Sequence, residues 1–250
     1  MGSVRGVRLP RPVVRAVARM KPYVPEQAWP VLQTLRSFTG DGPIIGTPSF
    51  RRVLALAAHP DDEVVGCGGL LALLADAGAE VHVCFATDGD ATTGVSVSPE
   101  EVARLRRAEA EASCRVLGTR PPRFLHHPDG RLAEHSSELA AQVEALVEEL
   151  RPEVVIAPWE LDGHHDHRAV AASVPSGIEV WGYESWTPLT ANRLVEVSSV
   201  FERMRQALAC HETAHLAFDV EAMLALDRYR SVHGLSGRGY AEAYLARAAT

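Results

Sequence analysis

The sequence predicts a Rossmann-like α/β fold, a doubly wound and mostly parallel sheet with helices on both faces. From Val53 onward, short apolar runs that suit buried strands alternate with longer segments of helical periodicity. The composition of the 250 residues, 46% hydrophobic and 23% charged, is ordinary for a globular core. We therefore expect one domain over residues 51–250. Residues 1–50, where arginines recur between prolines, are expected to form a helical extension that packs on this body.

The expected elements can be placed along the chain in order. They are strand 53–58, helix 64–77, strand 80–86, helix 99–117, strand 123–125, helix 136–150, strand 153–158, helix 168–172, strand 178–183, and C-terminal helices 200–215, 219–232 and 240–248. Gly78 and Gly118 end the first two helices. Ser98 and Pro99 begin the second, because serine is a preferred N-cap and proline suits the first helical position.

Charge and cysteine content restrict the partners and the compartment. The formal net charge of −7 argues against nucleic-acid binding, which requires a basic surface. The sequence has no run as long as a transmembrane helix and no apolar signal-peptide core at its start. The four cysteines show no Cys-x-x-Cys spacing and are expected to be buried free thiols. We therefore expect a cytoplasmic protein that acts on a small molecule; its oligomeric state is left open.

Acidic residues and histidines gather after the first and fourth strands. His59-Pro60-Asp61-Asp62-Glu63 follows strand 53–58, and Asp162-Gly163-His164-His165-Asp166-His167 follows strand 153–158. In a doubly wound sheet the first strand lies beside the strand that begins the second half, and ligands bind at their carboxyl ends. We expect the two segments to meet in one crevice. Their buried carboxylates favour a divalent cation, because unpaired buried charge is costly.

The two segments supply the ligands of a hydrolytic zinc site. Such sites use three protein ligands, commonly two histidines and one carboxylate, and leave one position for water. His59 and Asp62 are three residues apart on one turn, and His167 completes the set. Zinc is the expected ion, with Fe²⁺ or another divalent ion as the alternative. Asp61 is then left beside the ion as a general base for the attacking water.

His164 and Asp166 are expected to assist the same reaction. His164 could donate a hydrogen bond or a proton to the developing oxyanion and the leaving group, and Asp166 could orient that imidazole. An iron oxygenase is disfavoured, because the β/α alternation is not the all-β fold usual for such sites and Asp61 would have no task. A dinucleotide-binding module is also disfavoured, because the turn after the first strand lacks Gly-x-Gly-x-x-Gly and its acids would repel a pyrophosphate.

These motifs resemble the LmbE/PIG-L family of zinc-dependent N-deacetylases, which act chiefly on N-acetylglucosamine groups. The resemblance covers roughly residues 52–246 and rests on Ala58-His59-Pro60-Asp61-Asp62-Glu63, Thr87-Asp88-Gly89, Arg106-x-x-Glu109 with Leu117-Gly118, and the segment 162–167. It implies the metal ligands, base and acid given above, and adds Arg106 as a sugar contact and Asp88 as a pocket residue. Met204 departs from a usual lysine and Glu212-Thr213 from a usual Ser-Gln, both at the substrate end of the family pattern.

The sequence thus predicts a metal-dependent hydrolase that removes the acetyl group from an N-acetylglucosamine-type sugar or its conjugate. The products are acetate and a free amine. Two alternatives stay open. An amidase that removes a larger acyl group from an amino-sugar natural product would differ in pocket size, and a non-catalytic metal-binding homologue would keep the same ligands.

Overall fold

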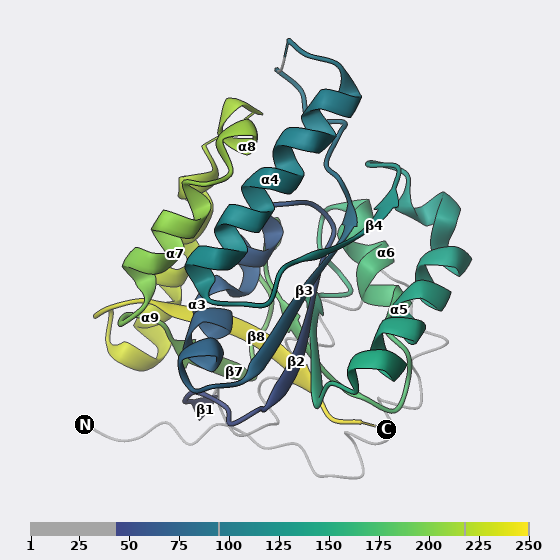
Figure 1. Ribbon diagram of the computed structural model, residues 1–250. Helices are drawn as coiled ribbons and strands as arrows, with labels where there is room; N and C mark the ends of the chain where they lie inside the picture. Colours follow the sequence, from purple (N-terminus) through teal and green to yellow (C-terminus); the bar gives the residue numbers. More distant parts are fainter. Residues whose placement is uncertain (1–43, 95, 218, 250) are drawn as a thin grey trace, which may run out of the picture.

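An eight-stranded sheet forms the middle layer of the molecule (Figure 1). The computed structural model describes residues 44–94, 96–217 and 219–249, so the predicted extension over residues 1–50 lies almost entirely outside it. The strands are β1 (Ile44–Ile45), β2 (Arg52–Ala57), β3 (Glu80–Thr87), β4 (Arg123–His127), β5 (Val154–Pro158), β6 (Glu179–Tyr183), β7 (Arg193–Glu196) and β8 (Ala241–Arg247). The helices are α3 (Asp62–Asp76), α4 (Pro99–Leu117), α5 (Ser136–Leu150), α6 (His165–Ser173), α7 (Phe201–Leu208), α8 (Glu212–Ala217) and α9 (Ala225–Leu235), with 3-10 turns η3 (Leu132–His135) and η4 (Val220–Leu224).

The sheet is doubly wound around β2 and β5. The strand order is β1-β7-β8-β6-β5-β2-β3-β4. β2 pairs in parallel with β3 on one side and with β5 on the other, and β4 and β6 continue the parallel block. The chain winds outward from β2 to β4 and then returns to β5, which makes the β2–β5 pair the switch point. The predicted fold class and the predicted central pair are confirmed.

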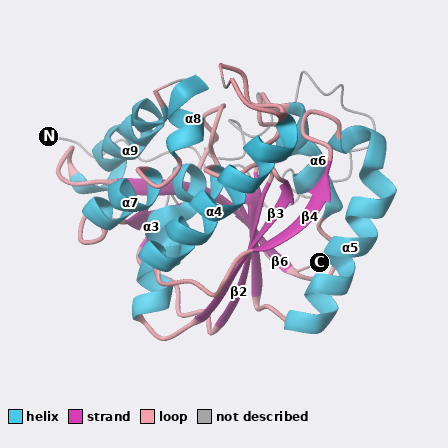
Figure 2. Cartoon of the chain, turned by 45° about the horizontal axis from the view of Figure 1, so that its top comes forward, coloured by secondary structure: helices cyan, strands magenta, loops and turns pink. Residues whose placement is uncertain are grey.

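Alternate residues of β2 face opposite helical layers. Val53, Ala55 and Ala57 join the core formed with α3, α4 and α7, whereas Leu54 and Leu56 join the core formed with α5 and α6. Figure 2 shows these two groups of helices on opposite sides of the strands. Burial on both faces explains why this strand is a continuous apolar run in the sequence. Within the described ranges, none of the helices combines the length and apolar character that crossing a bilayer requires.

The predicted C-terminal helix over 240–248 is a strand. β8 pairs antiparallel with both β6 and β7, and β7 is itself a strand that the sequence analysis does not predict. The alanines and glutamate that begin β8 favour a helix by local propensity. As a strand, however, the segment forms backbone hydrogen bonds with the edges of both β6 and β7, which a helix could not form.

The other two C-terminal helices are present in interrupted form. The predicted helix 200–215 breaks between α7 and α8, and the predicted helix 219–232 begins as the 3-10 turn η4 before α9. The break places His211 in a turn and directs it into the protein interior, where its side chain is fully buried.

A buried glutamate ties β8 to the helix that follows the central strand. Glu242 is 1% exposed and accepts hydrogen bonds from the backbone N–H groups of Gly69 and Leu70 in α3, at 2.6 and 2.8 Å. The Tyr244 hydroxyl donates to the same carboxylate at 2.6 Å. Burial raises the pKa of Glu242 from 4.5 to about 7, although these three hydrogen bonds oppose the rise.

Glu242→Gln is expected to change how stability depends on pH. Because the pKa of Glu242 is higher in the folded than in the unfolded chain, its protonation stabilises the fold fully below pH 4.5 and this contribution is lost as the pH rises to about 7. The loss is at most about 3 kcal/mol. Urea unfolding of both proteins between pH of about 5 and 8 measures it. The difference in unfolding free energy, wild type minus E242Q, should fall as the pH rises to about 7 and should stay level above that pH. A difference that is constant with pH would contradict the raised pKa of Glu242.

Candidate functional site

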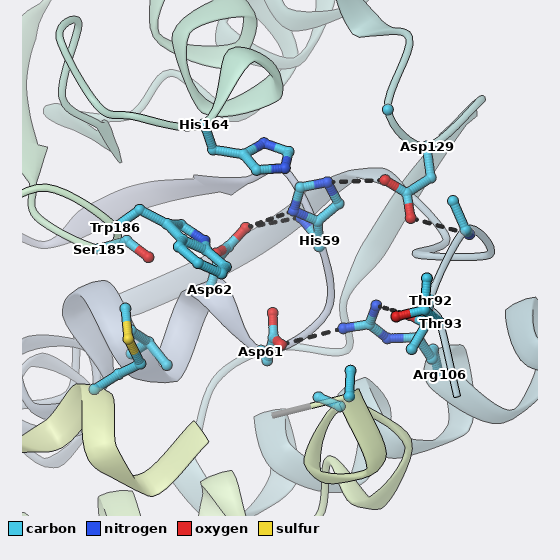
Figure 3. A pocket seen from close by; sticks show the side chains of 16 residues that line it. His59, Asp61, Asp62, Thr92, Thr93, Arg106, Asp129, His164, Ser185 and Trp186 are labelled. Atoms are coloured by element: carbon cyan, nitrogen blue, oxygen red, sulfur yellow. Dashed lines mark hydrogen bonds and ion pairs between the residues drawn. The ribbon is translucent and has the colours of Figure 1, made fainter. Parts of the chain in front are cut away.

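The polar segments that follow β2 and β5 meet over the carboxyl ends of these strands, as the topology predicts. They line a cavity of about 480 Å³, which is within the range of small-molecule sites (Figure 3). Loops that follow β3, β4 and β6, together with residues of α4, α8 and η4, complete the wall. The polar side chains of the lining are His59, Asp61, Asp62, Thr92, Thr93, Arg106, Asp129, His164 and Ser185.

Asp62 lies between two histidines. One carboxylate oxygen is 3.3 Å from His59 Nδ1, and the other is 3.2 Å from His167 Nε2. The backbone N–H of His59 donates to the Asp62 carboxylate at 2.9 Å and so fixes it against its own turn. Ligand atoms of a tetrahedral zinc ion lie about 3.4 Å apart, since each is about 2.1 Å from the metal. The structure thus places Asp62 between His59 and His167, one histidine at each carboxylate oxygen, and the three as ligands of one ion remain a prediction.

The surroundings of His167 fit a metal ion. Its side chain is fully buried, and neither ring nitrogen makes a hydrogen bond to any residue that the structure describes. Nδ1 lies 3.1 Å from Asp162, and a carboxylate beside the second ring nitrogen is a common partner of a metal-binding histidine. A buried imidazole whose ring nitrogens make no hydrogen bond is costly, and an ion at Nε2 reduces that cost. The residues present therefore fit a divalent metal ion.

The carboxylates make the site strongly electronegative. Burial alone would lower the pKa of His59, but its contacts with three aspartates outweigh burial and raise the pKa well above the usual value. Burial also acts to lower the pKa of His167, whereas Asp62 and Asp162 raise it to about 9. Both shifts have one physical meaning: the surrounding negative charge favours a positive charge at this point, whether carried by protons or by a metal ion.

His164 faces the cavity from the N-terminus of α6. Its Nδ1 accepts the backbone N–H of Asp166 at 3.3 Å, which leaves the ring proton on Nε2. Burial and the neighbouring positive charges of His59 and His167 lower the pKa of His164 to about 4. His164 is therefore neutral at pH 7 and can donate a hydrogen bond through Nε2. It also lies near enough to His59 and His167 to share one ion with them, since donor atoms of the three are within 4.8 Å of one another.

The Asp166 carboxylate contacts other partners than the predicted His164 imidazole. It accepts the backbone N–H groups of Gly130 and Leu132 at 2.7 and 3.1 Å, and it lies 3.3 Å from His59 Nε2. Only the backbone N–H of Asp166 contacts His164. The side chain therefore holds the loop after β4 against His59, which is a different task from orienting His164.

Asp61 projects into the cavity from a strained turn. Its φ of 127° and ψ of −32° are values that residues other than glycine rarely adopt. Arg106 Nη2 lies 3.2 Å from one Asp61 carboxylate oxygen. Burial raises the pKa of Asp61 to about 6, against the lowering effect of the Arg106 charge. A carboxylate with this pKa is ionised at neutral pH and still basic enough to accept a proton.

The two predicted substrate residues occupy different positions. Arg106 is 5% exposed and lines the cavity, and its guanidinium also donates to the Pro60 carbonyl. It therefore braces the turn that carries the proposed metal ligands. Asp88 does not line this cavity: its carboxylate is 2.8 Å from Arg107 Nη1 and 2.9 Å from His126 Nδ1.

Two aspartates of the site have no assigned role in the sequence analysis. Asp129 lies 3.0 Å from His59 Nε2 and lines the cavity. Asp162 is 1% exposed, accepts the backbone N–H of His164 at 2.9 Å and faces the His167 ring. A positional signal was available for both, because each follows directly on a predicted strand and so belongs to the carboxyl edge of the sheet.

Comparison with known proteins agrees with this geometry. The PIG-L family profile, described as GlcNAc-PI de-N-acetylase, matches residues 54–176, which include both polar segments. Just under half of the chain is thus similar to the PIG-L family domain. The resemblance expected from the motifs is thereby confirmed.

Individual relatives extend the comparison beyond this domain. The diacetylchitobiose deacetylase of Thermococcus kodakarensis is 29% identical over 190 residues, which cover 65% of this chain and 70% of that protein. The 1D-myo-inositol 2-acetamido-2-deoxy-alpha-D-glucopyranoside deacetylase of Kineococcus radiotolerans is 31% identical over 150 residues, 47% of this chain and 42% of that protein. The chain thus spans less than half of the second relative. The N,N'-diacetylchitobiose deacetylase structure from Pyrococcus horikoshii has a TM-score of 0.66 at 24% identity, covers 79% of this chain and 84% of its own, and has the same fold.

Asp162→Asn is expected to weaken metal binding while the fold is kept. The substitution preserves side-chain shape but removes the negative charge beside His167 Nδ1, so zinc affinity should fall about 10- to 100-fold. Competition with a chromophoric chelator measures the affinity, and circular dichroism monitors the fold. Asp88→Asn is the matched control, since Asp88 lies outside the cavity. Equal zinc affinities in the two variants would contradict the role given to Asp162.

Proposed function

We propose that this protein is a zinc-dependent N-deacetylase that hydrolyses the acetamide of an N-acetylglucosamine-type sugar or its conjugate. One observation carries the proposal: Asp61, a general-base candidate, lines the same cavity as His59 and Asp62, and His167 lies 3.2 Å from the Asp62 carboxylate. The family domain and the deacetylases among the relatives support the same class of reaction. Zinc is proposed because two histidines and one carboxylate are a common ligand set of hydrolytic zinc sites, with Fe²⁺ or another divalent ion as the alternative.

Asp61 is proposed to move the proton. A metal ion bound at the site would supply Lewis-acid activation of water and of the acetamide carbonyl. The Asp61 carboxylate accepts a proton from the attacking water, whose oxygen adds to the acetamide carbon. Asp61 then returns this proton to the amide nitrogen as the C–N bond breaks, and acetate and the free amine leave. The nearby Arg106 guanidinium holds the Asp61 carboxylate toward the cavity throughout.

His164 is proposed to stabilise the negative charge that develops on the carbonyl oxygen. A neutral imidazole with its proton on Nε2 donates a hydrogen bond without having to give the proton away. Because Nδ1 is occupied by the Asp166 backbone N–H, the donating nitrogen is fixed before substrate binds. This arrangement supports a role as oxyanion donor.

The lining of the cavity suits an amino sugar with an apolar attachment. Hydroxyl, guanidinium and carboxylate groups on one side can bind sugar hydroxyls; they belong to Thr92, Arg106 and Asp129. The apolar lining residues are Val65, Ala91, Ala214, Ala217 and Met223, and Trp186 adds an aromatic ring. The apolar residues favour, as the second candidate, an amidase that removes a larger acyl group from an amino-sugar natural product.

We further propose that residues 51–250 form the catalytic unit and that it works in the cytoplasm on a small-molecule substrate. The four cysteines are free, and Cys67, Cys84 and Cys114 are buried. Buried free thiols are compatible with a reducing compartment. The residues given as metal ligands, base and acid are part of the same proposal.

Metal removal is expected to abolish acetate release. Zinc-reconstituted and chelator-treated protein are incubated with a panel of N-acetylamino sugars and their conjugates, each also prepared with longer acyl chains, and the released acid is quantified. The proposed deacetylase should release acetate only with metal bound, and short-chain substrates should be preferred. Preference for long acyl chains would favour the amidase instead, and no release from any substrate by the zinc-loaded protein would contradict both.

Asp61→Asn is expected to lower turnover by about 10²- to 10⁴-fold with the metal retained, because asparagine keeps the shape of the side chain but cannot accept the proton. The measurement is steady-state acetate release together with zinc content. Asp88→Asn serves again as the control and should retain activity. Unchanged turnover in D61N would exclude Asp61 as the base, and a zinc-free D61N protein would reassign it as a ligand.

A further inference from the structure

The strained backbone of Asp61 is held at both of its polar atoms. Its carbonyl accepts the N–H groups of Val64 and Val65 at 3.0 and 3.1 Å. Its N–H donates to Glu63 Oε2 at 2.9 Å. A residue with a Cβ persists at φ 127° only where its surroundings determine the conformation, so the Glu63 contact is one of the restraints on the direction of the Asp61 side chain.

Glu63 is buried beneath this turn and does not face the cavity. Its side chain is fully inaccessible and does not line the pocket, so it is not placed to touch a substrate. Its two oxygens have different partners. Among the residues that the structure describes, Oε2 accepts the Asp61 N–H alone, whereas Oε1 accepts the Ser113 hydroxyl of α4 at 2.7 Å and lies 2.8 Å from His211 Nε2.

His211 reaches Glu63 from the turn between α7 and α8. Both side chains are completely buried, and each compensates for the desolvation of the other. A buried ion pair is a poor source of stability, because apolar residues of similar volume commonly serve as well. The contact that apolar residues could not reproduce is the one from Glu63 Oε2 to the Asp61 backbone.

We infer that Glu63 is a positioning residue for Asp61 and that His211 holds Glu63 in the orientation this task requires. The inference rests on the proposed function only in treating Asp61 as the base. It gives a role to His211, which lies 150 residues after Asp61 in the sequence. Asp61 is then positioned by two contacts: Glu63 binds its backbone N–H, and Arg106 binds its carboxylate.

The test compares Glu63→Gln with Ser113→Ala in the full-length, zinc-loaded protein. The glutamine of E63Q has one acceptor oxygen and one donor NH2 group, so it cannot accept from Asp61 on one side and from Ser113 and His211 on the other. If its oxygen turns to Ser113 and His211, the NH2 group faces the Asp61 N–H, and kcat should fall about 100-fold while KM and zinc content stay unchanged. S113A loses a contact to Oε1 alone and should keep kcat within about 3-fold of the wild type. Amide hydrogen exchange of the peptide that contains Asp61 should accelerate in E63Q and not in S113A.

His211 is tested by a pair of variants. His211→Gln can still donate to Glu63 and should recover a large part of the activity that His211→Phe loses. A purely structural role would lower Tm equally in both variants and leave kcat of the folded protein unchanged. E63Q with normal kcat and normal exchange at Asp61 would overturn the inference. If the wild type released no acetate, the proposed function would fail, and the exchange measurement would still decide whether Glu63 positions Asp61.

A separate observation concerns three side chains outside the cavity. His127 ends β4, His135 ends η3 and Glu138 lies in the first turn of α5. One donor atom from each lies within 4.8 Å of the others. The two imidazole centroids are 5.6 Å apart, and imidazoles bound to one tetrahedral ion have centroids about 5 Å apart.

His127 is oriented before any ion binds. It is 5% exposed, and its Nε2 lies 2.7 Å from Gln142 Oε1, which leaves the lone pair on Nδ1. His135 and Glu138 are partly and largely exposed, and their nearest donor atoms are 3.8 Å apart, too far for a hydrogen bond. An ion can therefore reach the group from solvent without opening the fold.

The geometry points to a peripheral site for a divalent transition-metal ion such as Zn²⁺, formed by His127, His135 and Glu138. The ion would join the two ends of the loop that carries Asp129 and Gly130, both of which line the catalytic cavity. It would stiffen that wall without touching a substrate.

Zinc titration against a chromophoric chelator tests this site. The wild type should bind two equivalents, the second more weakly. His135→Ala and Glu138→Gln should lose the weaker equivalent alone, and acetate release at one equivalent should be unchanged. Glu144→Gln, at another exposed glutamate of α5, should keep both equivalents, and His167→Ala should lose the tighter one. A single equivalent in the wild type, or two in H135A, would overturn the peripheral site.

Discussion

The parallel pairing of β2 with β5 is the contact on which the rest of the molecule depends. Val53, Leu54 and Ala55 lie opposite Val154, Val155 and Ile156. These six side chains are apolar and buried, so the pair is fixed by the core and not by the site. The position of the two polar segments of the site then follows from where the two strands end. Segments about a hundred residues apart in the sequence become neighbours because their strands are neighbours.

This arrangement creates an electrostatic conflict that the fold does not resolve alone. His59 contacts Asp62, Asp129 and Asp166, and His167 lies between Asp62 and Asp162. Burial removes water from these aspartates and histidines and so disfavours the charged form of each. All four aspartates reduce the conflict by also accepting backbone N–H groups: Asp62 from His59, Asp129 from Ala91, Asp162 from His164, and Asp166 from the loop after β4. The remaining negative charge favours a cation, and this is the physical reason for proposing a metal ion at the site.

The parts of this structure that were predictable from sequence are those set by local pattern. Buried strands followed by helices gave the fold class, and the confirmed strand order brought the two polar segments together as expected. The errors arise where distant segments decide. β8 has helix-forming residues but occupies an edge between β6 and β7, and the carboxylate of Asp166 meets a loop from β4 instead of its own neighbour His164. The contacts of Glu63 with Ser113 on α4 and with His211 after α7 were likewise unpredictable, because no local sequence pattern indicates them.

Substrate selection is best assigned to the loops and not to the positions where the sequence departs from the family pattern. Met204 is fully buried and packs against Gly69 of α3, so replacing the usual lysine alters the core. Thr213 donates to Glu109 of α4 and also lies outside the cavity lining.

Arg106 leads to the same assignment. Its two terminal nitrogens already contact Pro60, Asp61, Gly89 and Thr92, so the guanidinium is largely engaged in holding the proposed base Asp61 and the loop after β3. The groups left to distinguish one sugar conjugate from another are on the loops after β3, β4 and β6, with Thr93, Asp129 and Trp186 at the cavity wall. The chemistry and the choice of substrate therefore belong to different parts of the chain, and the loops can change without disturbing the β2–β5 edge that carries the reaction.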